Sequence, residues 1–117
     1  MDCPLDYSLC DQTVTLYRSN GNAVTRQVVE GAFYRWQDRG ADYKWGASPR
    51  RSFLLILPGD VDIAPGDRVI DGIGPEQVSW LSFTPATVDT LSEVDYVTTH
   101  YWEGRVCHRE AGRKAND

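Results

Sequence analysis

The sequence predicts an all-β protein, a small single-domain β-barrel or sandwich of about six to seven antiparallel strands with one long loop. Two observations lead to this fold class. Short segments of alternating apolar and polar residues recur along the chain, and turn-forming glycine, proline, asparagine and aspartate lie between them. No convincing helix interrupts the pattern. At 117 residues the chain can bury one core but has no room for a second domain.

The most informative stretch begins with an unbroken apolar run, Phe53 to Leu57, that stops at Pro58, Gly59 and Asp60. Its length and its end predict a buried strand rather than a helix. The alternation over 61–63 predicts a second short strand, 64–67 a second turn, and 68–71 a third strand. Such a meander is not stable alone, so we expect a further sheet to cover its apolar face.

The chain before this stretch predicts a hairpin. Residues 13–17 alternate and are rich in β-branched side chains, and the Asn-Gly within 19–22 is a strong hairpin-turn signal. A long return strand follows over 24–36. Its pattern changes near Glu30 and Gly31, which predicts a bulge that bends the strand. We expect Val24, Arg26 and Val28 on one face of this strand. We expect Val29, Gly31 and Phe33 on the other face.

Residues 37–49 show no strand pattern and predict the long loop. Loops of this length are uncommon in compact domains unless they are functional or disordered. The segment and its far edge combine basic and aromatic residues, which are frequent anchors of protein interfaces. One interpretation is a solvated loop that packs its tryptophan on the body. The other is a partner-binding loop, with Arg39, Tyr43, Lys44, Trp45, Arg50 and Arg51 as the contact residues.

The C-terminal part predicts the remaining strands. Residues 77–83 are interpreted as a strand or as a partly buried connection, and 87–102 as a long strand in which 90–93 could equally hold a short helical turn. Glu103 and Gly104 predict a turn, and 105–109 the final strand.

These elements divide the chain into three parts. Residues 1–11 form an N-terminal arm, 12–111 the β-barrel domain, and 112–117 a polar C-terminal tail.

Composition and charge exclude several classes of protein. Apolar residues make up 41% of the chain and charged residues 25%, which is typical of a folded soluble domain. The net charge of −5 argues against a general nucleic-acid binder, whose affinity comes from neutralising phosphates. We expect neither a signal peptide nor a membrane span, because no apolar run is long enough for either.

The three cysteines are Cys3, Cys10 and Cys107, without a C-x-x-C pair. The odd number and the spacing argue against a secreted disulfide scaffold and favour ordinary thiols in a reducing compartment. Together with His108 they have the ligand types of a zinc site. Structural zinc normally shows a close cysteine pair, however, so we expect no metal and no cofactor.

The residues do not suggest catalysis. The two histidines, His100 and His108, have no recognisable orienting partner in the sequence. The aspartates of the central stretch lack the order of an EF-hand and are interpreted as turn and strand-surface residues rather than calcium ligands: Asp60, Asp62, Asp67 and Asp71. We therefore expect a protein that is not an enzyme.

Two segments resemble a known family. One is ILPGDVDIAPGDRVIDG, from Ile56 to Gly72, and the other is the spacing V-x-x-G-x-x-x-x-W that begins at Val28 and ends at Trp36. In their order along the chain, with the closing strand pair, they resemble the small minor-capsid or head-tail connector proteins of tailed bacteriophages. The resemblance extends from about Thr13 to Lys114.

This resemblance implies a β-barrel subunit that forms a ring with copies of itself in the neck of the virion, between portal or adaptor proteins and tail proteins. Such a stopper-like ring helps to close the DNA channel, and DNA passes through its lumen without sequence-specific binding. A tail-terminator, minor tail or capsid-decorating protein of the same particle is a close alternative, and a monomeric β-barrel binding adaptor is another. The implied location is the virion, assembled in the bacterial host cytoplasm.

Overall fold

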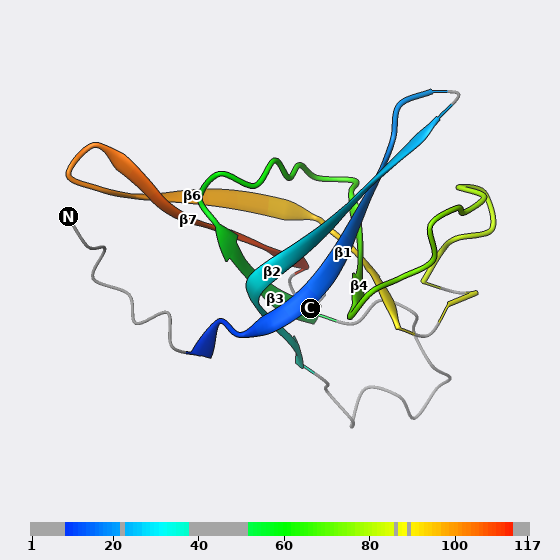
Figure 1. The fold of residues 1–117 in the computed structure, drawn as a ribbon, viewed down its shortest axis with the longest axis horizontal. Coiled ribbons are helices and arrows are strands. Elements are labelled where there is room, and N and C mark those ends of the chain that lie inside the picture. Colours follow the sequence, from blue (N-terminus) through cyan, green and yellow to red (C-terminus); the bar gives the residue numbers. More distant parts are fainter. Residues whose placement is uncertain (1–8, 22, 38–51, 86, 89, 114–117) are drawn as a thin grey trace.

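A computed structural model describes residues 9–21, 23–37, 52–85, 87–88 and 90–113. Within these residues the protein is all-β, as the sequence predicts, and it contains seven strands (Figure 1). The strands are β1 (Gln12–Ser19), β2 (Val24–Gln37), β3 (Ser52–Pro58), β4 (Arg68–Asp71), β5 (Leu91–Glu93), β6 (Tyr96–Trp102) and β7 (Arg105–Arg113).

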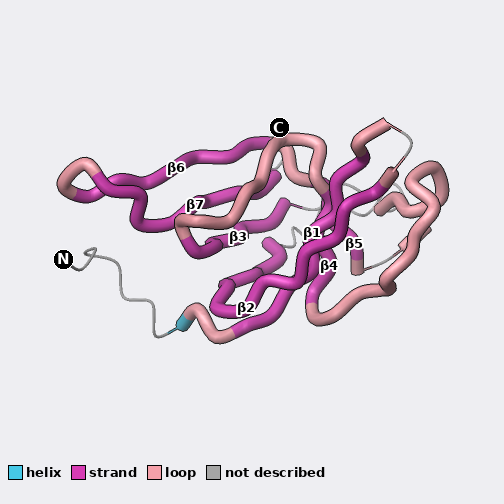
Figure 2. The backbone as a smooth tube through the Cα atoms, turned by 45° about the horizontal axis from the view of Figure 1, so that its top comes forward, coloured by secondary structure: helices cyan, strands magenta, loops and turns pink. Residues whose placement is uncertain are grey.

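The strands form one antiparallel sheet in the order β5-β4-β1-β2-β3-β7-β6, curled into a half-barrel. Figure 2 shows its two halves, one with β3, β7 and β6 and one with β1, β4 and β5. The end strands β5 and β6 follow each other in the chain. Between them, Val94 N donates to Asp67 O and Asp95 N donates to Gly112 O, both at 2.8 Å. The short connection therefore links the two ends of the curled sheet.

Strand β2 belongs to both halves. Its first part pairs with β1, from Val24 opposite Ser19 to Ala32 opposite Gln12, and its last part, from Phe33 to Gln37, pairs with β3. The predicted bulge lies where the partner changes, and Gly31 there has φ of 73°, a conformation that glycine adopts without strain. The bulge supplies the bend that a curled sheet needs.

The bulge also changes which side chains of β2 face the core. The sequence predicts Val29, Gly31 and Phe33 on one face, but Val29, Ala32 and Tyr34 are the buried residues. An extra residue in a strand shifts the alternation by one, so Phe33 is only half-buried. This part of the prediction is wrong for that reason.

The core lies inside the curl. In β3 the buried side chains alternate, Phe53, Leu55 and Leu57 being at most 2% exposed. They pack in one cluster with residues of the other strands and of the connections: Val14, Leu16, Val29, Ala32, Tyr34, Val61, Ile63, Val69, Val94 and Ala111. A second cluster joins Tyr17, Ile70, Phe83 and Leu91.

One predicted strand is not formed. Residues 61–63 lie in a connection between β3 and β4, although Val61 and Ile63 are buried as their alternation indicates. Their burial comes from packing into the core rather than from a ladder. The flanking turns are as expected: Val61 N donates to Pro58 O, and Asp67 N donates to Ala64 O.

The C-terminal part differs in detail. Residues 77–83 are a connection with turns, which settles the alternative that the sequence leaves open. The strand predicted over 87–102 is shorter and consists of β5 and β6, so 91–93 is extended rather than a helical turn. The last strand, β7, continues to Arg113 instead of ending at residue 109.

Candidate interaction surfaces

The six residues predicted to contact a partner lie outside the described part of the chain: Arg39, Tyr43, Lys44, Trp45, Arg50 and Arg51. Within the described residues, exposed apolar side chains lie on the β6–β7 hairpin and on the connection between β4 and β5.

The β6–β7 hairpin projects from the body at one end of the molecule (Figure 1). Its turn is Glu103-Gly104, as predicted, with φ of 52° and 78° between the paired Trp102 and Arg105. Positive φ at both central residues defines the turn type whose twist matches a tight hairpin. The register shifts after His100, and the extra residue, Cys107, lies on β7. Strand β6 itself therefore keeps a regular alternation.

Apolar side chains at the tip of this hairpin face solvent. Tyr101 is 66% exposed, Trp102 41% and Val106 40%. Tyr101 and Val106 are opposite each other in the register, so they form one patch, and Trp102 lies beside the turn on the other face of the hairpin. We call these three residues the hairpin tip. Clustered exposed apolar residues of this kind are typical of contact sites, and aromatic residues are the usual energetic centres of such contacts.

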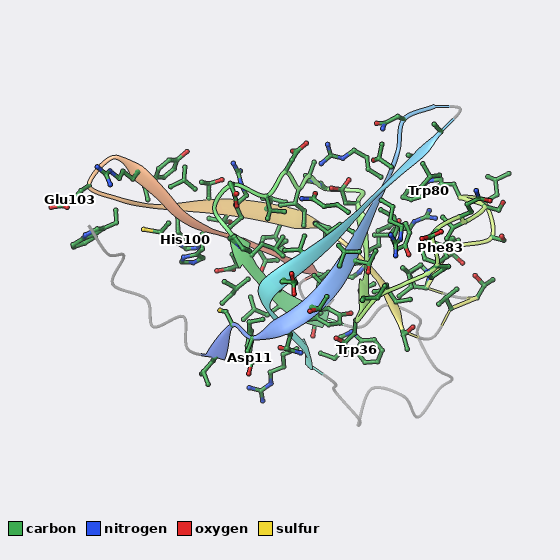
Figure 3. All side chains as sticks on the ribbon, in the orientation of Figure 1. Asp11, Trp36, Trp80, Phe83, His100 and Glu103 are labelled. Atoms are coloured by element: carbon green, nitrogen blue, oxygen red, sulfur yellow. The ribbon has the colours of Figure 1, made fainter. Side chains whose placement is uncertain are left out.

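A second exposed apolar site lies on the connection between β4 and β5. Leu81 is 92% exposed and Ile73 is 74% exposed. Figure 3 shows Trp80 and Phe83, on this connection, toward the end of the molecule opposite to Glu103 of the hairpin turn. We call Leu81, which lies between Trp80 and Phe83 in the chain, the connection site. Leu81, next to Trp80 in the chain, and the hairpin tip thus lie toward opposite ends of a body whose longest extent is 47 Å.

Buried contacts hold this connection in place. The Arg68 guanidinium lies 3.8 Å from the centre of the Trp80 ring, and it donates to the carbonyl oxygens of Trp80 and Phe83. The Phe83 ring meets Tyr17 edge to face at 4.7 Å. Tyr17 Oη donates to Pro75 O at 2.7 Å. Burial raises the pKa of the Tyr17 hydroxyl, so it remains a donor at neutral pH. Leu81 is therefore presented from a fixed backbone.

Both histidines of the chain lie together on the hairpin. His100 and His108 are opposite each other in the register, and their rings stack with centres 4.4 Å apart. His100 Nε2 is 3.2 Å from Glu110 Oε1, and Tyr96 Oη donates to the other carboxylate oxygen, Glu110 Oε2. Burial and the neighbouring His100 lower the pKa of His108. Stacked side chains across a strand pair stiffen the hairpin, and nothing in this arrangement resembles a nucleophile beside a base.

The aspartates of the central stretch have structural partners. Asp67, with a side chain only 6% exposed, accepts from Arg18 Nε and Nη2 at 2.8 Å and from Ala64 N at 2.9 Å. Asp62 is 82% exposed and accepts from Arg18 Nη1 at 2.8 Å, so its pKa is lowered. We call this group the Arg18 clasp. One guanidinium binds both carboxylates, and Asp67 also makes the turn bond expected of it.

The cysteine prediction is wrong in one respect. Cys107 is disulfide-bonded, so it is not one of three ordinary thiols. Cysteine number and spacing do not reveal which side chains the fold brings together. Within the described residues, no group of three or more histidine, cysteine, aspartate or glutamate side chains is arranged to hold a metal ion. In the same residues there is no helix of the length and apolarity needed to cross a membrane.

Sequence reasoning did not single out the hairpin tip or the connection site. A signal existed for the tip, because two aromatic residues directly before a Glu-Gly turn must lie at the end of a hairpin. No comparable signal marks Leu81, since its neighbours Trp80 and Phe83 point to the body while it does not.

No family model, curated protein or solved structure matches this chain.

Proposed function

We propose that this protein is a structural subunit of a tailed bacteriophage or a phage-derived particle. Several copies form a ring in the head-tail connector, which joins portal to tail and helps to close the DNA channel. The particle is proposed from the resemblance of the segments 28–36 and 56–72 to connector proteins.

The observation that carries the assembly role is the position of the two exposed apolar sites. A ring is built by a heterologous contact, in which one surface of each copy binds a different surface of the next. Such a contact needs two sites on different sides of one subunit. The hairpin tip and the connection site lie at opposite ends of the long axis and offer apolar side chains for it.

The electrostatics agree with this role. The net charge of −5 gives a ring of copies an acidic character, and an acidic lumen repels passing DNA instead of binding it. Three of the described arginines have partners within the chain: Arg18 in the clasp, Arg68 with Trp80, and Arg109 with Gly59 O and Thr99.

The proposed contact is tested with two variants, each of which removes one of the two sites. Leu81→Glu keeps the hairpin tip, and Val106→Glu keeps the connection site. Each variant alone is expected to remain unassembled under the conditions in which the wild-type protein forms rings on the purified portal or tail assembly. An equimolar mixture is expected to give complexes of one copy of each variant, because the intact tip of one binds the intact connection site of the other. Native mass spectrometry distinguishes these species.

The control is Gln27→Glu, which adds the same charge on an exposed position of β2. It is expected to assemble as the wild type does. Rings formed equally well by all three variants would contradict the contact. A protein that stays monomeric beside every portal and tail component would contradict the connector function and favour a free-standing binding adaptor.

A further inference from the structure

Within the described part of the chain, one edge of strand β6 from Val97 to Trp102 has no strand paired with it. Among the described residues β6 pairs with β7 alone, which leaves the backbone groups of its other edge without a neighbouring strand. Natural edge strands are usually protected by short length, by proline, by lysine or other charges, or by a bulge. The segment from Val97 to Trp102, VTTHYW, contains no proline, lysine, arginine, aspartate or glutamate. The extra residue of the nearby bulge, Cys107, belongs to β7.

The other end of the sheet differs. Strand β5 has only three residues, two of them are buried, and the third is the charged Glu93, which lies 3.5 Å from Arg68 Nε. It offers too short an edge for pairing. Strand β6 is therefore the edge on which an added strand fits.

The sequence of β6 is complementary to itself. In an antiparallel pair of two β6 strands centred on Thr99, Val97 lies opposite Tyr101, Thr98 opposite His100, and Thr99 opposite Thr99 of the second copy. Aromatic residues opposite β-branched ones, and threonine opposite threonine, are among the favourable cross-strand pairs. No like charges are opposed at neutral pH. A register centred on a residue also satisfies the alternating hydrogen bonds of an antiparallel ladder.

We propose that β6 pairs with β6 of a second copy of this chain around a two-fold axis at Thr99. The pairing extends the sheet of one copy into that of the other. In protein that is not assembled into a ring, it covers the outer edge of β6. It goes beyond the proposed function, because a two-fold contact closes after two copies and does not build a ring. Since Tyr101 belongs both to this edge and to the hairpin tip, the dimer and the ring compete for the same side chain.

A cysteine introduced at the two-fold axis tests the register. In the proposed dimer the two copies of residue 99 face each other at a Cα separation of about 4.5–5.5 Å, which a disulfide spans. Thr99→Cys is expected to give a covalent dimer under mild oxidation. The matched control is Thr98→Cys, whose two copies are not opposite each other, and it is expected to cross-link no more than the wild type does. Equal cross-linking of both variants would overturn the register.

A charge on the edge tests the pairing itself. Thr98 is exposed, so Thr98→Lys leaves the core unchanged. Because each dimer carries the lysine twice, the dissociation constant of the free protein is expected to rise by about tenfold or more. Gln27→Lys, an exposed position of β2, serves as the control and is expected to leave it unchanged. Analytical ultracentrifugation measures the dissociation constants of both variants.

The result also separates this proposal from the proposed function. Val106→Glu and Leu81→Glu are expected to leave the β6 dimer intact, whereas Thr98→Lys is expected to leave ring assembly intact. A wild-type protein that is monomeric at high concentration, or a dimer that Thr98→Lys does not weaken, would overturn the β6 pairing while leaving the connector function open to its own test.

Discussion

The Arg18 clasp and the hairpin tip differ in whether their side chains have partners within the chain. In the clasp, charged groups are tied to each other and to backbone: Arg18 binds Asp67, and Asp67 also accepts from Ala64 N. At the tip, apolar side chains that a stable monomer would bury are left in solvent, Tyr101 above all. The difference teaches that the buried groups of the body stabilise the fold, whereas the apolar side chains of the tip are exposed and can contact a partner without unfolding the body.

The largest effect is expected in the body. Leu16 of β1 is 4% exposed and packs in the main core cluster. Leu16→Ala removes its buried methyl groups and leaves a cavity, so the free energy of unfolding is expected to fall by about 3 kcal/mol. Urea denaturation measures it. A loss below about 1 kcal/mol would show that the core near β1 is loosely packed and that the contrast with the tip is unfounded.

The clasp offers a comparison within one ion-pair group. Asp67→Asn removes the charge of a nearly buried carboxylate that holds Arg18 in place, and we expect a loss of about 2 kcal/mol. Asp62→Asn removes the exposed carboxylate on the same guanidinium, and we expect little change because solvent screens that pair. Thermal and urea unfolding of both variants in one buffer provide the measurement. Equal losses would mean that burial does not decide the strength of the clasp.

The histidine pair predicts a smaller, pH-dependent effect in the hairpin. The pKa of His108 is lowered in the fold, so between that value and its unfolded value near 6.5 the unfolded chain binds more protons. Stability is therefore expected to fall as pH decreases from 7.5 to 5.5. His100 and Glu110 face the same ring, and Glu110 partly offsets the repulsion between the two imidazoles.

His108→Gln removes this titration while keeping a polar side chain. The variant is expected to lose less stability than the wild type over the same pH interval, as followed by urea denaturation at several pH values. If the free energy of unfolding of the variant depends on pH as that of the wild type does, other groups cause the effect.

The smallest effect on stability is expected at the tip. Tyr101→Ser exposes no new cavity, because the ring is already mostly in solvent, and the free energy of unfolding is expected to change by less than about 0.5 kcal/mol. The same substitution is expected to weaken association strongly. A large loss of stability in the monomer would show that Tyr101 packs on its own chain and is not reserved for a partner.

Much of the fold follows from local chemistry in the sequence. The first hairpin, the bulge at Gly31, the buried strand at Phe53–Leu57 and the Glu103-Gly104 turn were all predicted from residue type and alternation. The strand predicted over 61–63 is not formed, because alternation reports burial and a ladder also needs a partner strand nearby. The faces of β2 after the bulge were missed since one added residue reverses the alternation.

The candidate surfaces were harder to predict. Tyr101, Val106 and Leu81 are exposed because of where the hairpin and the connection end in space, and a single sequence carries no direct signal of that. The disulfide of Cys107 depends likewise on a fold that brings distant parts of the chain together. The predicted contact loop lies outside the described residues, so its role remains a prediction.

The central claim is that the outer parts of the hairpin are contact surfaces between copies, whereas the body folds without a second copy. Hydrogen exchange at two protein concentrations tests this claim. The amides of 97–102 are expected to exchange more slowly at high concentration, whereas those of β1 are expected to be slow and unchanged. Thr98→Lys is expected to abolish the slowing. Identical exchange of 97–102 at both concentrations, in a protein that remains monomeric, would contradict the account.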